Sequence, residues 1–119
     1  MAATGGEGLC LHFDGELRPV RFGPGPHVVS SDRDLDDPEL PEKRLFDELL
    51  AAGPPDDDAL RTYLSSHVGG RPVCKHGDRF GTVSSTIYRE GPGGRRLLHA
   101  EGPPCRAAFA DLTRALGAP

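Results

Sequence analysis

The hydrophobic and polar positions at the start of the chain favour short strands. Leu9 to Phe13 and Leu17 to Phe22 are mostly apolar, and the Asp14-Gly15 dipeptide between them is typical of a tight hairpin turn. Pro19 cannot donate a ladder hydrogen bond, so the second run is expected at a sheet edge. His27 to Ser30 predicts a further short strand, followed by an acidic surface loop.

Apolar residues at helical spacing predict three helices. The first runs from Pro41 to Ala52, with Pro41 at its first position and Gly53 after its end. The second is capped by Asp56 or Asp57 and runs to about His67, before Gly69-Gly70. The third follows Pro103-Pro104, and its apolar stripe consists of Cys105, Ala108, Phe109, Leu112, Ala115 and Leu116.

The pattern between the second and third helices predicts the centre of the fold. Val83 to Tyr88 is rich in β-branched and aromatic residues with small hydroxyls between them, which favours a strand. A turn-rich loop leads to a second strand-like run, Arg95 to Ala100. We therefore expect an antiparallel hairpin with Ile87 in the core. The predicted fold class is α+β, an antiparallel sheet with helices on one face.

Length and composition limit the classes of protein that the chain can represent. Its 119 residues predict a single domain, 1–119, in which we expect residues 1–8 to be disordered. A net charge of -4 argues against nucleic acid as a partner, which would need a basic face. No apolar run predicts a membrane span, and no secretory leader is visible. We expect a cytoplasmic protein whose three cysteines are free thiols.

Two Cys-x-His pairs are the strongest candidates for metal chemistry. Cys10 and His12 form one pair, and Cys74 and His76 form the other. In a strand, residues i and i+2 point to the same face, so the four side chains could converge on a tetrahedral zinc. The usual gap of about two to four residues between paired ligands is absent. Chance placement in strands is therefore the favoured interpretation, and we expect no metal and no cofactor.

The central strand carries the candidate binding residues. Ser84, Ser85 and Thr86 could line the floor of a pocket, and Arg79 could bind an anion. The alternative is that the hydroxyls fill a tight sheet interface and bond to neighbouring backbone, and that Arg79 forms a surface ion pair. Cys105 is interpreted as a small buried hydrophobe, since no base is evident that would activate it as a nucleophile. No catalytic residue is expected.

Three segments together resemble one known family. Phe80-Gly81-Thr82-Val83-Ser84-Ser85-Thr86 is similar to the Tyr-Gly-Thr-Arg-Ser-Ser-Thr motif in the C-terminal half of the NRDE family, also called the transport and Golgi organisation protein 2 family. Pro26 to Ser31 with Leu35 to Pro38, and Gly102-Pro103-Pro104-Cys105, resemble further segments of that family. The resemblance runs from about Leu9 to Phe109.

The resemblance implies half of the four-layer αββα sandwich of N-terminal-nucleophile hydrolases. The family is linked to secretory organisation and to haem or lipid handling. Two departures change what can be carried over. Val83 stands where many members have Arg, and Ala2 stands where the family begins Met-Cys, ahead of an Asn-Arg-Asp-Glu signature that is also missing. The resemblance therefore implies a non-catalytic C-terminal part of such a protein.

Two alternatives remain open at this stage. The chain could be an independent small α+β binding or interaction module, whose apolar sheet face is covered by a homodimer or by a partner chain. It could also be an amide hydrolase if processing exposed Cys10 as an N-terminal thiol. The small-molecule ligand, if there is one, is not predicted.

Overall fold

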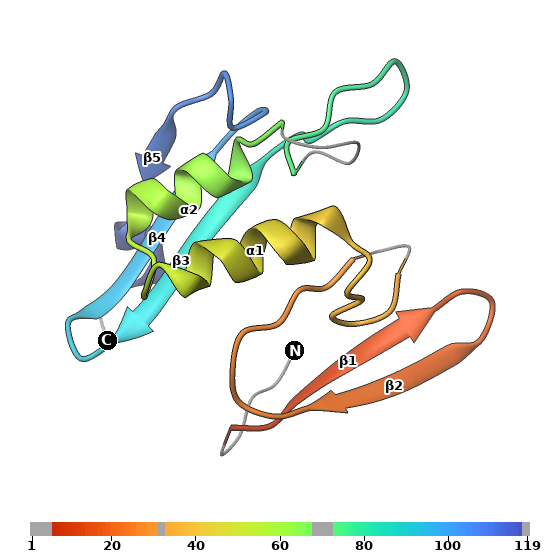
Figure 1. Ribbon diagram of the computed structural model, residues 1–119. Coiled ribbons are helices and arrows are strands. Elements are labelled where there is room, and N and C mark those ends of the chain that lie inside the picture. The colour runs from red at the N-terminus through yellow and green to blue at the C-terminus, as the bar shows by residue number, and fades with distance from the viewer. Residues whose placement is uncertain (1–5, 31–32, 68–72, 118–119) are drawn as a thin grey trace. The chain divides into compact units, whose positions relative to one another are not determined.

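A computed structural model describes residues 6–30, 33–67 and 73–117, and it confirms the α+β fold class (Figure 1). The described residues form two antiparallel sheets, two α-helices and a 3₁₀ helix. The chain divides into two compact units, Met1–Arg44 and Leu45–Pro119. The sequence predicted one domain over 1–119, and each unit is described separately below.

The N-terminal unit begins with the predicted hairpin. Strands β1 (Gly8–Phe13) and β2 (Leu17–Phe22) pair antiparallel, with Phe13 opposite Leu17 and Gly8 opposite Phe22. A Cβ atom at Gly8 would lie only 2.1 Å from the Phe22 ring, so glycine lets that ring pack across the partner strand. Gly8, the last residue of the segment 1–8 that was expected to be disordered, begins β1, and residues 1–5 lie outside the described part of the chain.

The short strand predicted at His27 to Ser30 is absent, and that prediction was wrong. The backbone of Val28 is satisfied by Asp36 instead of by a neighbouring strand. The Val28 N–H donates to the Asp36 carboxylate at 2.7 Å, and the Asp36 N–H donates to the Val28 carbonyl at 3.0 Å. Asp36 takes a positive φ of 56°, a conformation that aspartate tolerates better than most residues. Ser31, within the NRDE-like segment, lies outside the described residues.

Two helices follow where the sequence predicted them. Helix α1 (Pro41–Ala51) crosses the boundary between the units, and α2 (Asp57–Leu64) belongs to the C-terminal unit. The Asp56 side chain caps α2 by accepting a hydrogen bond from the Ala59 N–H at 2.8 Å. Helix α2 ends at Leu64, earlier than the expected His67. Gly69 and Gly70, predicted to stop it, lie outside the described residues.

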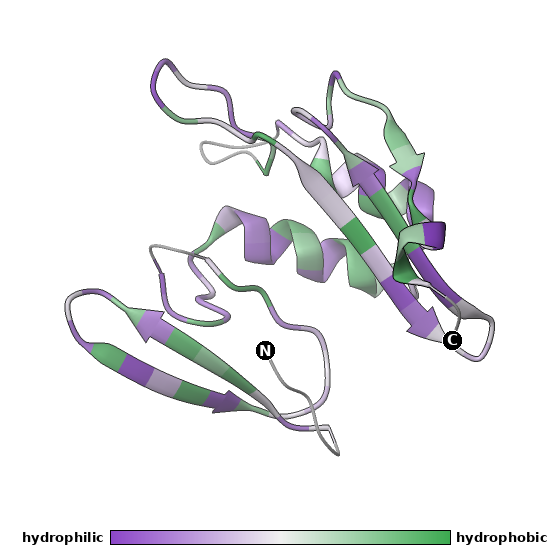
Figure 2. Ribbon diagram, turned by 180° about the vertical axis from the view of Figure 1, so that it is seen from behind, coloured by the Kyte–Doolittle hydropathy of each residue, from purple (hydrophilic) through white to green (hydrophobic). Residues whose placement is uncertain are grey.

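The C-terminal unit is built on a three-stranded antiparallel sheet. Its strands are β3 (Ser85–Gly91), β4 (Gly94–Ala100) and β5 (Phe109–Asp111), in the order β3-β4-β5. The predicted hairpin is confirmed, with Ile87 opposite Leu98, and both side chains are buried. Figure 2 shows the apolar middle of β3 and its hydrophilic C-terminal end. The strand begins later than predicted, because Val83 lies outside it and is 79% exposed.

The third predicted helix does not form, and that prediction was wrong. The segment begins instead as a turn around Cys105, continues as β5, and ends as a short 3₁₀ helix, η1 (Thr113–Leu116). The free edge of β4 provides the physical reason, because its backbone groups need partners. Phe109 pairs with Ala100, and the Leu112 N–H donates to the Leu97 carbonyl at 2.8 Å. Pairing with this edge outweighs the local helical pattern.

Helix α2 lies over one face of the sheet (Figure 1). Asp57, in its first turn, accepts a hydrogen bond from Arg89 Nε of β3 at 2.6 Å and forms an ion pair with Arg96 Nε of β4 at 3.2 Å. Arg89 also donates to the Pro55 carbonyl. The opposite face of β3 carries Tyr88, which is half exposed. Helical cover on one face is thus confirmed for this sheet.

Candidate metal centre

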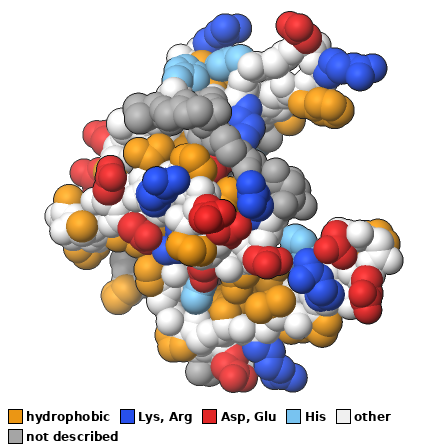
Figure 3. Space-filling view, turned by 45° about the vertical axis from the view of Figure 1, so that its right-hand side comes forward, with side chains coloured by type: hydrophobic (Ala, Val, Ile, Leu, Met, Phe, Trp, Pro, Cys, Tyr) orange, Lys and Arg blue, Asp and Glu red, His pale blue; other side chains and the backbone are white. Residues whose placement is uncertain are grey.

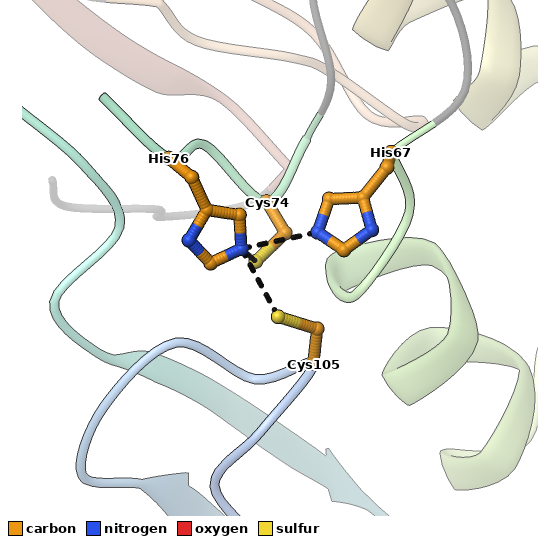
Figure 4. A group of neighbouring side chains, drawn as sticks. All are labelled: His67, Cys74, His76 and Cys105. Carbon is orange, nitrogen blue, oxygen red and sulfur yellow. Dashed lines mark hydrogen bonds between the residues drawn. The ribbon is translucent and has the colours of Figure 1, made fainter. Parts of the chain in front are cut away.

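Four side chains of the C-terminal unit converge in one small cluster, shown in Figure 4. They are His67, Cys74, His76 and Cys105, and their potential ligand atoms all lie within 4.8 Å of one another. We call these four residues the Cys₂His₂ cluster. They come from three segments, namely the chain after α2, the loop before β3 and the turn after β4.

The register of the sheet explains why these segments meet. Ser85, the first residue of β3, pairs with Ala100, the last residue of β4. The loop that enters β3 and the turn that leaves β4 therefore start from the same end of the hairpin. A third segment joins them because the Cys74 N–H donates to the carbonyl of Ser66 at 3.0 Å, next to His67.

The loop that carries Cys74 and His76 is closed by reciprocal hydrogen bonds between Lys75 and Thr82. The Lys75 N–H donates to Thr82 Oγ1 at 2.9 Å, and the Thr82 N–H donates to the Lys75 carbonyl at 2.8 Å. A Cβ atom at Gly81 would lie 3.0 Å from that same carbonyl, so glycine allows the two backbone segments to approach closely here. The loop thus has little room for larger residues.

Cys105 lies in a tight turn and not in a helix. The N–H groups of Arg106 and Ala107 both donate to the Pro103 carbonyl at 2.9 Å, which folds the chain back on itself. The turn leaves the Cys105 side chain exposed. The interpretation of Cys105 as a buried hydrophobe was therefore wrong, because it assumed a helical stripe that does not form.

His76 lies at the centre of the cluster. Its Nε2 atom is 3.1 Å from His67 Nε2, 3.1 Å from Cys105 Sγ and 3.6 Å from Cys74 Sγ. Zinc–sulfur bonds of about 2.3 Å and zinc–nitrogen bonds of about 2.0 Å place tetrahedral ligand atoms roughly 3.3–3.8 Å apart. The observed separations of 3.1–3.6 Å overlap that range, so small shifts of the side chains would suit tetrahedral coordination.

The burial of Cys74 couples metal binding at the cluster to the loss of a proton. Burial raises the pKa of the Cys74 thiol, and a hydrogen bond from the Cys105 backbone N–H partly opposes that rise. Without a cation, Cys74 is therefore held as the neutral thiol near neutral pH. A divalent metal ion would displace that proton, because the thiolate is the form that binds metal.

The donor set identifies the metal that fits best. Two cysteine sulfurs and two imidazole nitrogens form a soft, tetrahedral set of the kind that structural zinc sites use. Four protein donors fill the coordination sphere and leave no open position for water or substrate. The chemistry that the cluster supports is therefore the joining of chain segments through a metal, not hydrolysis.

The predicted binding residues do not gather in one place. Arg79 and Ser84 are exposed and lie before β3, whereas Ser85 and Thr86 are consecutive residues of β3 and point to opposite faces. Thr86 Oγ1 lies 2.8 Å from the Nδ1 atom of His99 on the neighbouring strand. No common pocket wall is formed by these four residues, and their role in binding stays a prediction.

The other Cys-x-His pair belongs to the N-terminal unit. Cys10 and His12 lie in β1 and are both half-buried on one face of the hairpin, as the period of two predicted. Neither residue is a member of the Cys₂His₂ cluster. In the structure, Cys74 and His76 are instead joined by His67 and Cys105, which the sequence did not single out as ligands.

Figure 3 shows Lys and Arg side chains interspersed with Asp and Glu on the face in view, and no broad basic patch is visible there. None of the helices in the described part of the chain is long and apolar enough to cross a bilayer.

Comparison with known proteins finds no match among protein families, curated proteins or solved structures. The likeness to the NRDE family is therefore a resemblance of short sequence motifs alone.

Proposed function

We propose that the chain is a small metal-binding α+β module, in which one Zn²⁺ is held by the Cys₂His₂ cluster. The observation that carries this proposal is that two thiol and two imidazole donors from three separate segments lie within 4.8 Å of one another. The proposal departs from the expectation of no metal, which considered only the pairs visible as Cys-x-His in the sequence.

The metal's role in this proposal is to stabilise the fold. Among the described residues of the C-terminal unit, the buried apolar side chains are few: Cys74, Ile87, Leu98, Ala100 and Pro104. A core of that size contributes little stability, and small domains commonly add a structural metal to compensate. A zinc bound at the cluster would tie the end of α2, the loop before β3 and the turn after β4 together.

The test is zinc stoichiometry measured by elemental analysis after dialysis. We expect about one zinc per chain for the wild type, and its loss in Cys74→Ser and in Cys105→Ser. Cys10→Ser is the matched control, because it removes a cysteine outside the cluster and should retain the zinc. A wild-type protein with no zinc after zinc loading, or a control that loses zinc equally, would overturn the proposal.

We also propose that the chain is the non-catalytic C-terminal part of an NRDE-type protein with an N-terminal-nucleophile-hydrolase-like fold. One structural observation favours it. Phe80 to Thr86 runs into the start of β3, and Gly102 to Cys105 lies in the turn after β4, so two of the resembling motifs lie at the same end of one hairpin. Sequencing the transcript upstream of the Met1 codon tests the idea. A Met-Cys start and an Asn-Arg-Asp-Glu segment in frame would support it, and an upstream in-frame stop codon would contradict it.

A further inference from the structure

We propose that Cys74 and Cys105 form a peroxide-sensitive thiol pair, which oxidises to a disulfide and releases the bound metal. The inference deepens the proposed zinc site, because it assigns a redox control to two of its ligands. The proposed disulfide depends on the short distance between the two sulfur atoms and does not require a bound metal.

The two sulfur atoms already lie side by side. They are within 4.8 Å of each other. A disulfide requires the sulfurs to approach to about 2.05 Å. The exposed turn after β4 can supply that movement, while the Cys74 backbone stays anchored to the Ser66 carbonyl.

Access to an oxidant differs between the two cysteines. The Cys105 side chain is exposed, whereas Cys74 is 0% exposed. A small oxidant in solution therefore meets Cys105 first, and Cys74 is placed beneath it as the resolving thiol. This division into an accessible and a resolving cysteine is the arrangement that redox-sensing cysteines use.

The reaction balances with hydrogen peroxide as the oxidant. The Cys105 thiolate attacks one peroxide oxygen, the O–O bond breaks, and the products are a Cys105 sulfenic acid and hydroxide. The Cys74 thiolate then attacks the Cys105 sulfur, forming the S–S bond and expelling a second hydroxide. Two protons from solvent convert both hydroxides to water. The two sulfurs together lose two electrons, peroxide gains them, and Zn²⁺ leaves with its charge unchanged.

The zinc-bound state and the disulfide state both join the turn after β4 to the loop before β3, but only the zinc-bound state also holds His67. The disulfide keeps the turn after β4 attached to the loop before β3, as the metal does. It removes both thiolate ligands, and two imidazoles alone bind zinc far more weakly than the full set. Oxidation would therefore release the His67 side chain from the metal, while the hydrogen bond from Cys74 to Ser66 keeps the chain after α2 attached to the loop before β3.

The experiment uses the full chain loaded with zinc and treated with hydrogen peroxide. A chromophoric chelator reports released zinc, and mass spectrometry of a non-reducing tryptic digest reports the cross-link. Trypsin separates the cysteines, because Cys74 falls within residues 62–75, Cys105 within 97–106 and Cys10 before Arg21. We expect one zinc released per Cys74–Cys105 disulfide formed, and zinc binding restored after reduction. Cys10→Ser should behave like the wild type.

The outcomes separate this inference from the zinc proposal. If zinc binds but peroxide neither releases it nor forms the Cys74–Cys105 link, the thiol pair is overturned and the zinc site stands. If no zinc binds, the zinc proposal fails, and the same digest of the peroxide-treated metal-free chain decides the thiol pair by the presence or absence of that link. A dominant disulfide to Cys10 would overturn the pairing in either case.

Discussion

The Nε2 atom of His76 lies 3.1 Å from the Sγ atom of Cys105, although 29 residues separate the two in the sequence. The intervening residues are mainly the β3–β4 hairpin, which brings its two ends together. The contact therefore depends on the hairpin, and a metal bound there would in turn stabilise the hairpin. This mutual dependence is the basis of the first prediction.

Zinc should stabilise the chain against unfolding. A ligand that binds only the folded state adds about 2.7 kcal/mol to the free energy of unfolding when its free concentration is 100 times its Kd. Thermal melts with and without zinc measure the effect, and Cys10→Ser is the control that should keep it. Equal melting temperatures with and without zinc, in protein shown to be fully reduced, would contradict the prediction.

Ile87 should be a principal core residue. It is 5% exposed and faces Leu98 across the hairpin, so Ile87→Ala removes buried apolar volume from both strands. We expect a loss of about 2–5 kcal/mol in the free energy of unfolding, measured by denaturant melts. Val83→Ala is the control, because Val83 lies outside β3, and it should change stability by less than about 0.5 kcal/mol. An Ile87→Ala loss as small as that of the control would remove the hairpin from the centre of the fold.

The elements that were predicted correctly are those whose sequence signals act over only a few neighbouring residues. The Asp14-Gly15 turn, the Asp56 cap and the β-branched composition around Ile87 each act within a few residues, and the structure confirms the elements they predict. The last segment is different. Its apolar spacing suits a helix, but the free edge of β4 provides partners for its backbone, and only knowledge of the sheet could reveal that competition.

The sequence revealed only part of the candidate metal site, because its other ligands are brought together by the sheet and not by a local pattern. Cys74-x-His76 can be read from the sequence, whereas Cys105 joins it through the pairing of Ser85 with Ala100, and His67 joins it through the bond from Cys74 to Ser66. A signal was nevertheless present. The predicted hairpin places the residues just before its first strand beside those just after its second, so Cys105 could have been considered as a third ligand.

Asp57 should contribute more to stability than its neighbour Asp58. Both lie in the first turn of α2, so both interact with the helix dipole in a similar way. Asp57 is largely buried and bonds to Arg89 and Arg96 of the sheet, whereas Asp58 is 84% exposed and pairs with Arg61 of its own helix.

We therefore expect Asp57→Ala to cost about 1 kcal/mol, a value reduced for solvent screening because both arginines are partly exposed. Asp58→Ala is the matched control and should cost under about 0.5 kcal/mol. Denaturant melts of the two variants measure the difference. If Asp57→Ala and Asp58→Ala cost the same stability, the ion pairs of Asp57 with Arg89 and Arg96 would add nothing beyond a negative charge at the N-terminus of α2.

The N-terminal hairpin should promote association of the chain. One face of β1 and β2 exposes Leu11, Phe13 and Leu17, and a two-stranded hairpin is marginally stable unless such a face is covered. We expect light scattering to detect a dimer or larger species, and Phe13→Ser to reduce it. His12→Ser changes the other face of β1 and serves as the control. A wild-type protein that stays at 12.7 kDa at high concentration would contradict this prediction.

His27 should titrate above its ordinary range because of Asp36. The imidazole Nδ1 lies 2.6 Å from the Asp36 carboxylate, and Nε2 lies 2.7 Å from the Gly23 carbonyl. Both partners can only accept, so only the doubly protonated ring satisfies both at once. The hydrogen bond to Asp36, followed by that to Gly23, accordingly raises the pKa of His27 above 6.5. For Asp36, burial acts to raise the pKa, but the hydrogen bonds from His27 and Val28 outweigh it and lower the pKa below 3.8.

The signs of the two shifts define a pH window. A raised histidine pKa contributes stability that is fully present below 6.5 and is lost as the pH rises through the folded-state value. A lowered aspartate pKa contributes stability that is present above 3.8 and is lost as the pH falls through the folded-state value. The pair should therefore stabilise the 23–36 loop most between these two pH values, and progressively less above pH 6.5.

Proton NMR titration of the His27 ring measures this directly. We expect a pKa above 6.5 in the wild type that falls toward 6.5 in Asp36→Asn, with part of the rise kept because the Gly23 carbonyl remains. The stability difference between the two proteins should shrink as the pH rises past the wild-type His27 pKa, because the wild type then loses the charged pair that the variant already lacks. Asp34→Asn removes an exposed carboxylate of the same loop and should leave the titration unchanged. A wild-type His27 pKa at or below 6.5 would show that the His27–Asp36 hydrogen bond does not hold the loop.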